Sequence, residues 1–485
     1  MKTNRWNNVS VVLGRLLYIG FSIQIVFGII WMAKNIGYVQ MFGDASYNVT
    51  LSGVLSGDGD TGILYPAIVL LTRALGEITF VPWYSYLYIL QIMLAVIAGY
   101  LLMAETKVFG NKRRRFVWGS LVLATFPPIM QIHTAILVNS FLLSLFMLQA
   151  VFIIKAWKCI HDNKSVTADY VYAISGVALF WLLMSLTKWF CFFIGAIPVV
   201  ATFIAIAVMA VKNRGYVDGK RNPIGLYEAR KIVISSFVTM MLFCGLVIGI
   251  DKLTNDTNLS QRGEVSIDKL MFERLAWKAG FGRGDALLTS FNGIVDSNVL
   301  YGTMLHQDNI RLEFEPELES KVGIEEAERL YRQTNLAIWK YSRSEVIKDF
   351  AIDMAGYAMP QVMLRIFLEK NKYITYTPRN YDSFKRNSAV LSKYYMDYSL
   401  LWFVISLIIG VIIIGLRIAG KLVKADRRIT GAYIVIGITC ICIAIRNVML
   451  GNCMYDYKEA GSAMVTWFMV LFTFCGYSIF DEDVK

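Results

Sequence analysis

Long apolar runs alternate with short polar segments along most of this 485-residue chain. Several runs reach the roughly 20 residues that a helix needs to cross the hydrocarbon core of a bilayer. Uninterrupted apolar runs satisfy their backbone hydrogen bonds as helices, and the alternating pattern of a membrane barrel strand is absent. We therefore expect an all-α polytopic membrane protein of about ten transmembrane helices. The predicted spans lie near residues 10–32, 81–103, 116–132, 134–154, 170–187, 190–211, 232–250, 398–419, 430–449 and 462–480.

Two longer polar stretches predict how the chain divides. Residues 1–250 are expected to form an N-terminal transmembrane module of about seven spans, with a first outer loop at residues 33–80. Residues 398–485 are expected to form a C-terminal module of about three spans, and residues 251–397 a mainly helical extracytoplasmic domain, with helical patterns at 325–339 and 344–367. Residues 63–75 are apolar but interrupted by Pro66 and Arg73, which predicts a juxtamembrane helix lying on the membrane surface.

Composition and charge narrow the class of protein. Only 17% of the residues are charged, whereas soluble domains carry about one quarter. The net charge is +12, but Lys and Arg gather in short loops that alternate with loops poor in both, as in the run 112–115. This distribution anchors orientation rather than binding nucleic acid, and it predicts a multi-pass protein of the cell membrane with both termini in the cytoplasm. The seven cysteines lack the spacing of a metal site or a disulfide framework.

Two residues at predicted outer corners between spans are candidates for binding. Lys188 lies between two spans at the outer face, where the positive-inside rule disfavours a cation. It is either a snorkelling anchor beside Trp189 or the partner of a lipid phosphate. His133 occupies the preceding outer hairpin, either as a proton carrier or hydrogen-bond donor, or as a loop histidine with neither role.

The last predicted outer loop gathers aromatic and charged residues beside a span. Tyr457 and Lys458 lie in this loop, and Arg446 is close to the same face. The group is either an interfacial belt with snorkelling ends or a second grip on a phosphate. An acid, Asp44, opens the first outer loop and is followed by a Tyr65-Pro66 pair. Taken alone, an acid in a loop is a solvated charge.

These features together resemble glycosyltransferases of the C fold class (GT-C), which include protein O-mannosyltransferases and the transferases that put aminoarabinose on lipid A. The resemblance covers mainly the first 210 residues. It rests on the acid-led loop, the juxtamembrane Tyr-Pro helix and the segment Leu186-Thr187-Lys188-Trp189, which runs into a span containing Pro198. The chain differs from many relatives in having Ala45 after Asp44 and no proline after Tyr457.

The resemblance implies a sugar donor carried on polyprenyl phosphate and an acceptor hydroxyl on an extracytoplasmic glycan, lipid or protein. Asp44 would be the catalytic base in an inverting displacement. The donor phosphate would be bound by Lys188, with Arg446 and Lys458 behind it, because cations stabilise its charge best in a low-dielectric site. Tyr65, His133 and Tyr457 would contact substrate. No cofactor is implied firmly, and no metal-ligand cluster specifies the divalent cation that such chemistry allows.

Other classes of protein fit parts of the same pattern. A polymerase or ligase of lipid-linked oligosaccharides would also combine about ten spans with a large outer domain, but with more arginines near the membrane. A transporter would carry charged or Gly/Pro-broken positions in mid-span and paired halves. The spans here carry few ionisable groups away from their ends, and no internal duplication is visible. A non-enzymatic assembly protein of envelope glycans fits the sequence as well.

Overall fold

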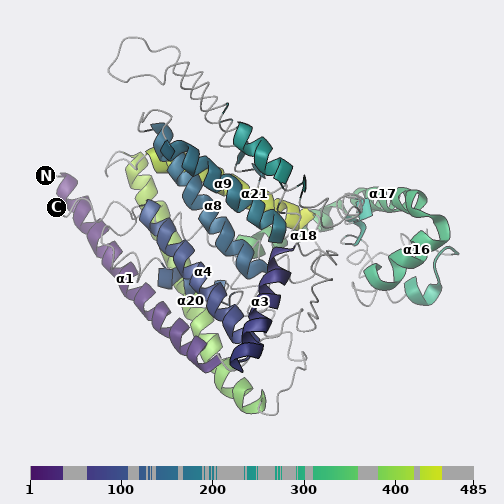
Figure 1. Cartoon of the computed structure of the whole chain (residues 1–485), viewed down its shortest axis with the longest axis horizontal. Helices are drawn as coiled ribbons and strands as arrows, with labels where there is room; N and C mark the ends of the chain where they lie inside the picture. Colours follow the sequence, from purple (N-terminus) through teal and green to yellow (C-terminus); the bar gives the residue numbers. More distant parts are fainter. Residues whose placement is uncertain are drawn as a thin grey trace, which may run out of the picture. The chain divides into compact units, whose positions relative to one another are not determined.

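The computed structural model describes residues 2–35, 63–106, 120–126, 129–130, 133, 138–161, 168–187, 291, 293–300, 310–358, 381–419 and 427–449, with scattered residues at 191–249 and 268–275. These residues are almost entirely helical, and no β-strand occurs among them. The expected all-α class is confirmed for this part of the chain (Figure 1).

The chain divides into two compact units. Unit 1 comprises Met1–Asn255, Met359–Ile441 and Ala463–Lys485, and unit 2 comprises Asp256–Ala358 and Cys442–Ser462. The described helices of unit 1 are α1 (Lys2–Asn35), α3 (Leu64–Thr79), α4 (Trp83–Thr106), α6 (Leu121–Ala124), α8 (Val138–His161), α9 (Ala168–Thr187) and α20 (Tyr381–Ile418). Unit 2 contains the π-helix η4 (Ile310–Phe314), α16 (Glu315–Val322), α17 (Ile324–Tyr341) and α18 (Arg343–Ala358). Helix α21 (Arg427–Met449) crosses the division.

Within the described part of unit 1, three helices are long and apolar enough to cross a membrane. They span Trp83–Thr106, Val138–Cys159 and Ala168–Thr187, and they correspond to the predicted spans near 81–103, 134–154 and 170–187. Shorter apolar stretches occur at Arg15–Trp31, Phe237–Leu246, Asp397–Ile412 and Ala432–Ile445. The three helices are compatible with a membrane protein, and the total of about ten spans stays a prediction.

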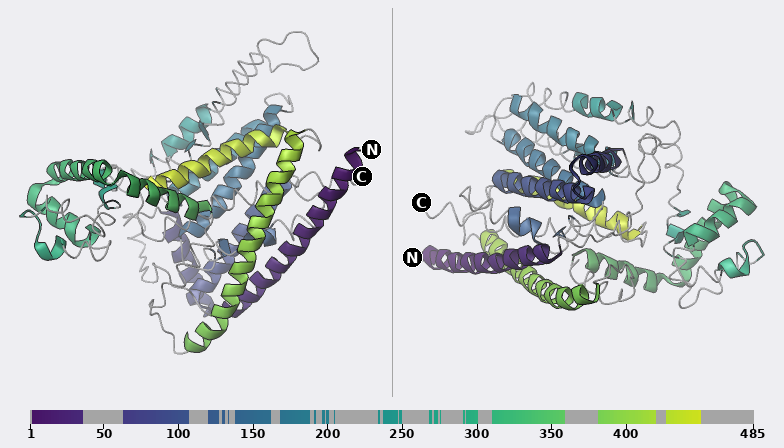
Figure 2. Two further views of the ribbon diagram at one scale, coloured as in Figure 1. Left: turned by 180° about the vertical axis from the view of Figure 1, so that it is seen from behind. Right: turned by 60° about the horizontal axis from the view of Figure 1, so that its bottom comes forward.

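Helices α4, α8 and α9 pack side by side and set the geometry of unit 1 (Figures 1 and 2). Gln91, near the start of α4, binds His133 just before α8 begins, whereas Glu105, at the end of α4, pairs with Lys158 near the end of α8. These contacts make α4 and α8 parallel. Helix α9 runs antiparallel to α8. The connection between the two helices is short in sequence, and Gln149 of α8 donates to the carbonyl of Val177 in α9.

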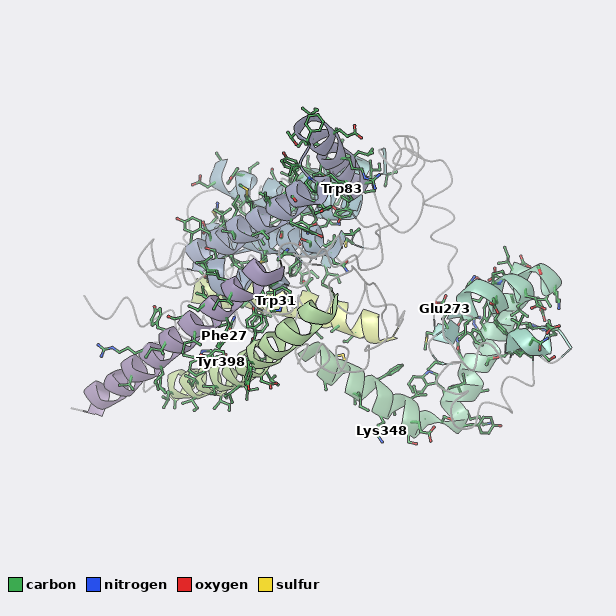
Figure 3. The ribbon with its side chains drawn as sticks, turned by 90° about the horizontal axis from the view of Figure 1, so that it is seen from below. Phe27, Trp31, Trp83, Glu273, Lys348 and Tyr398 are labelled. Carbon is green, nitrogen blue, oxygen red and sulfur yellow. The ribbon has the colours of Figure 1, made fainter. Side chains whose placement is uncertain are left out.

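A second helix pair, α1 and α20, also belongs to unit 1. Phe27 of α1 and Tyr398 of α20 have ring centroids 5.5 Å apart, and Figure 3 shows both residues with Trp31 along this contact. The Tyr398 hydroxyl donates to the carbonyl of Gly20 at 2.9 Å. Because these residues are far apart in the sequence, this helix pair connects the N-terminal and C-terminal segments of unit 1.

The expected juxtamembrane helix forms as α3, which begins at Leu64 and ends at Thr79. Its buried side chains Tyr65, Val69 and Thr72 recur at helical spacing and lie on one face. This face packs against α4 and α9. Ile78 and Phe80 at its other end remain exposed. The helix itself is confirmed, and its position on a membrane surface stays a prediction.

Unit 2 has its own hydrophobic core. The helical pattern predicted at 325–339 forms α17, and the pattern predicted at 344–367 forms α18 as far as Ala358. Phe272 is the centre of an aromatic group in which it stacks on Phe314 and lies 4.8 Å from the Tyr331 ring centroid. The buried core residues are Phe272, Phe291, Val295, Leu300, Ile310, Phe314, Leu318, Ala327 and Tyr331.

Candidate functional site

The imidazole of His133 lies in the interior of unit 1 at the beginning of α8. Its Nδ1 is 2.7 Å from the Oγ of Ser140, seven residues later in the sequence and in α8. Its backbone carbonyl accepts a hydrogen bond of 3.0 Å from Nε2 of Gln91 in α4. His133 is 2% exposed, Gln91 is 1% exposed and Ser140 is fully buried. His133 therefore joins two parallel helices through one backbone and one side-chain contact.

The environment of His133 makes its imidazole neutral. Burial lowers the pKa of His133 to about 4, because the charged form would lose its hydration without gaining a counter-charge. At neutral pH the ring then carries one proton, and Nδ1 shares a hydrogen bond with Ser140 in either tautomer. The Nε2 atom has no hydrogen-bond partner among the described residues. The geometry favours a hydrogen-bonding role for His133 over the alternative of a proton carrier.

Tyr65 lies near the same end of α8. This residue of α3 is fully buried, and its ring meets Phe141 of α8 edge-on with centroids 5.6 Å apart. Phe141 follows Ser140 directly, so α8 contacts Tyr65 and His133 within two consecutive residues. The structure thus brings two of the substrate-contact candidates to one end of one helix.

The end of α9 lies level with this group. Lys155 of α8 is over the ring of Tyr172, while Gln149, earlier in α8, reaches Val177, later in α9. Moving one residue back along α8 therefore corresponds to moving about one residue forward along α9. Continued at the same rise per residue, this register sets Thr187, which is fully buried, level with Ser140. Lys188 is the next residue in the sequence and lies outside the described residues.

The remaining predicted site residues are not tested by this geometry. Asp44, Tyr457 and Lys458 lie outside the described residues, as does Lys188. Arg446 belongs to the last part of α21, but its side chain is outside the described part of the chain. Their proximity to Tyr65 and His133 stays a prediction.

The structure adds residues that we did not expect from the sequence. Gln91, Ser140 and Ser144 are polar, almost fully buried and positioned within predicted spans. The sequence does contain an indication of them, since polar residues inside apolar spans usually face the interior of a helix bundle. Ser140 and Ser144 also share one face of α8, being four residues apart. Without their partners, however, such residues are hard to tell from ordinary small packing residues.

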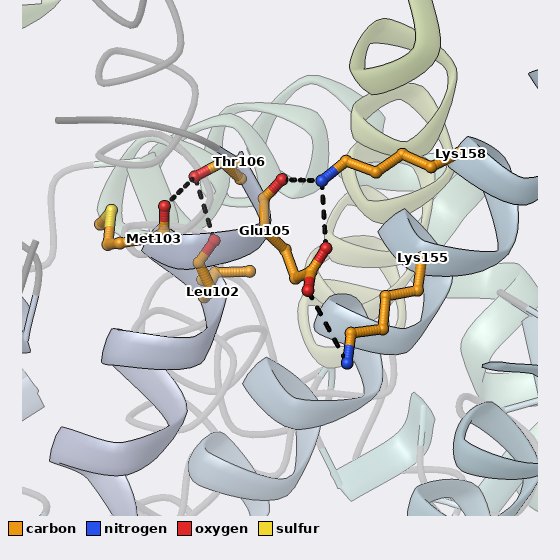
Figure 4. Close-up of polar contacts among 6 residues, drawn as sticks. All are labelled: Leu102, Met103, Glu105, Thr106, Lys155 and Lys158. Atoms are coloured by element: carbon orange, nitrogen blue, oxygen red, sulfur yellow. Dashed lines mark hydrogen bonds and ion pairs between the residues drawn. The ribbon is translucent and has the colours of Figure 1, made fainter. Parts of the chain in front are cut away.

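The opposite end of α4 and α8 carries an ion-pair cluster (Figure 4). Glu105 of α4 lies 3.0 Å from the Nζ of Lys158 and 3.7 Å from that of Lys155. Lys158 also donates to the backbone carbonyl of Glu105. The two lysines of α8 thus connect this helix to α4.

Unit 2 contains a separate buried carboxylate, Glu315, which is 2% exposed. Lys269 lies 3.4 Å from Glu315 and 2.5 Å from Glu319. The pKa of the Glu315 carboxyl is raised to about 8, first by burial and then by the neighbouring charge of Glu273, against the opposing effect of Lys269. Figure 3 shows Glu273 in this region.

Neither metal chemistry nor ancestry identifies the site. Among the described residues, no group of three or more His, Cys, Asp or Glu side chains is arranged to hold a metal ion. No protein-family model matches the chain, no curated protein matches it, and no solved structure matches its fold.

Proposed function

We propose that this protein is a membrane glycosyltransferase that moves a sugar from a polyprenyl-phosphate donor to an extracytoplasmic acceptor, a cell-envelope glycan, lipid or protein. The observation that carries the proposal is the buried polar group of Gln91, His133 and Ser140 at one end of apolar helices. Buried polar residues within an apolar bundle are costly and usually serve a function. Tyr65 reaches the same end, which supports a substrate site there.

The proposed reaction needs a base for the acceptor hydroxyl and a cation for the leaving phosphate. The Asp44 carboxylate takes the proton of the acceptor hydroxyl, whose oxygen forms a bond to the anomeric carbon of the sugar. The bond between this carbon and the phosphate oxygen breaks, and its electron pair leaves with polyprenyl phosphate. Attack from the face opposite the leaving group inverts the anomeric configuration. Lys188, assisted by Arg446 and Lys458, stabilises the phosphate charge that develops in a low-dielectric site.

These two requirements match the features of the site. Because phosphate is a good leaving group, the reaction needs no strong general acid, and a neutral His133 is compatible with that requirement. A cation is needed at the level of the lipid headgroup, and Lys188 directly follows Thr187, which is level with Ser140. The predicted arrangement of ten spans with both termini in the cytoplasm belongs to the same proposal.

The test uses purified full-length protein in liposomes with polyprenyl phosphate carrying a hexose or a pentose. We measure lipid binding and sugar release for the wild type, Asp44→Asn and Lys188→Ala. Loss of turnover by a factor of about 10²–10⁴ in Asp44→Asn with donor binding retained, and loss of donor binding in Lys188→Ala, would support both assignments. Wild-type turnover in Asp44→Asn would remove the base assignment. Failure to bind any lipid-linked sugar would favour a transporter or assembly protein.

A further inference from the structure

Two buried polar atoms near the start of α8 lack a hydrogen-bond partner among the described residues. They are Nε2 of His133 and Oγ of Ser144. His133 is 2% exposed and Ser144 is fully buried. Buried polar atoms are nearly always satisfied by protein, water or ligand. Two such atoms, one on His133 and one on α8, therefore indicate where a bound polar group completes the hydrogen bonding.

These atoms belong to a group of polar residues, the polar strip, which we define as His133, Ser140 and Ser144. Nδ1 of His133 is 2.7 Å from Ser140, and Ser144 follows Ser140 by about one turn on the same face of α8. The strip thus runs from the end of α8 that contacts Tyr65 toward the interior of the helix bundle. Its position beside apolar helices means that a ligand group there is largely shielded from water.

The chemistry of the strip selects an uncharged ligand. Nδ1 is engaged by Ser140, so Nε2 is a donor in one neutral tautomer and an acceptor in the other. A phosphate or carboxylate would be satisfied only by the donor form, and a cation only by the acceptor form. A hydroxyl both donates and accepts, so it suits either tautomer and also the hydroxyl of Ser144. The unpartnered atoms therefore suit a sugar hydroxyl, which needs no counter-charge in a buried site.

We propose that the polar strip of His133, Ser140 and Ser144 binds a hydroxyl of the sugar on the lipid-linked donor, with Nε2 of His133 as a specificity-determining contact. This inference rests on the proposed function, and it assigns the strip to the sugar and Lys188 to the phosphate. Ser140 is then a positioning residue that holds the imidazole through Nδ1.

The experiment compares full-length protein in nanodiscs with two probes, polyprenyl phosphate alone and the same lipid carrying a hexose or a pentose. His133→Asn keeps a polar atom at the distance of Nδ1 but loses Nε2, whereas His133→Gln reaches the position of Nε2. We expect His133→Asn to weaken binding of the sugar-bearing lipid by about 5- to 10-fold and to leave the bare lipid unchanged. His133→Gln should recover most of the loss, and Ser144→Ala should cause a smaller loss with the same selectivity.

Each of the following results would overturn the proposal. Equal weakening for both lipids would assign His133 to folding or to the phosphate, and unchanged binding of both would remove its contact with the sugar. Because a neutral imidazole makes the contact, the affinity difference between the two lipids should be constant between about pH 6 and 8; a difference that grows at low pH would indicate a charged ring. If the wild type binds neither lipid, the proposed function fails together with this inference. If it binds the bare lipid but His133 contributes nothing, only this inference fails.

The stability of each variant is measured separately, so that a folding defect is not mistaken for a binding defect. If His133→Asn unfolds at a clearly lower temperature than the wild type, Ser144→Ala decides the question. Its small side-chain change removes one unpartnered hydroxyl without touching the bond between His133 and Ser140. A loss of affinity confined to the sugar-bearing lipid would then support the proposal. A Ser144→Ala variant that binds each lipid as tightly as the wild type does would overturn it.

Discussion

The indole ring of Trp402 in α20 packs directly on Gly20 in α1, so closely that a Cβ at position 20 would overlap the ring. Small residues allow this approach, which is a common way for apolar helices to associate in a membrane. The hydroxyl of Tyr398, one turn before Trp402, binds the carbonyl of Gly20 at 2.9 Å. Gly20 is thus a point of direct contact between α1 and α20.

Gly20→Ala should destabilise unit 1 by about 1–3 kcal/mol, because overpacking forces a rigid indole out of its position. The measurement is thermal unfolding in detergent. Gly245→Ala is the matched control, since no described residue lies within 4 Å of a Cβ at that helical position, and it should be neutral or slightly stabilising. Adding Trp402→Ala to Gly20→Ala should recover part of the loss. Equal unfolding temperatures for Gly20→Ala and Gly245→Ala would contradict this packing.

The ion-pair cluster of Glu105, Lys155 and Lys158 should contribute to the pairing of α4 and α8. Its side chains are between 21% and 30% exposed, so water screens the pair only in part. We expect Glu105→Ala to cost about 1–2 kcal/mol, because it leaves two neighbouring lysines without their carboxylate.

Unfolding of the Glu105→Ala variant is compared with wild type at low and high salt, and the difference should narrow as salt rises. The control is Glu326→Ala in α17, which removes an exposed pair with Arg329 and should change stability by less than about 1 kcal/mol. A Glu105→Ala effect no larger than that of the control would show that the cluster is only a surface feature.

Unit 2 should lose stability as pH rises through neutrality. The pKa of Glu315 is about 8 in the folded protein, whereas an unfolded chain gives glutamate its ordinary value of 4.5. Between these values the folded form holds a proton that the unfolded form has released, so unfolding becomes easier with increasing pH. The loss should be complete above about pH 8.

Hydrogen exchange of α16 and α17 amides, corrected for the intrinsic effect of pH, measures this dependence in the full-length protein. Glu315→Gln cannot ionise, and its protection should vary much less over the same range. Glu326→Gln, at an exposed position, is the matched control and should follow the wild type. A wild-type protection that increases from pH 5 to 8 would show the opposite sign and refute the assignment.

Helix α3 should lie with its exposed apolar side chains in the bilayer. Leu71 and Ile78 are 59% and 74% exposed, although both are large and apolar. Spin labels at Leu71 and Ile78, in a protein lacking its native cysteines, should be relaxed more by lipid-soluble oxygen than by an aqueous nickel complex. A label at the fully buried Val69 is the control and should be protected from both reagents. Greater relaxation by the aqueous reagent at Leu71 and Ile78 would place this face in water.

The pattern of residues predicted the helices better than their contacts. Hydrophobicity and length are local properties, and they sufficed to predict α4, α8 and α9 close to their observed bounds, as well as α3 and α17. The partners of polar residues are not local. Gln91 and His133 are 42 residues apart, and no pattern at either position indicates the bond between them. For the same reason the sequence predicted His133 and Tyr65 only as weak, separate candidates.

By itself, the sequence determined that this is a helical, strongly apolar chain, because backbone hydrogen bonding and side-chain burial act over one helix at a time. The predicted outer positions of Asp44 and Lys188 also follow from the sequence alone, and they remain predictions. Only the tertiary structure decided which side chains meet. The packing of α4 against α8 buries His133, whose carbonyl accepts from Gln91, and this burial lowers the pKa of its imidazole. The close approach of α20 to Gly20 likewise depends on packing between distant segments.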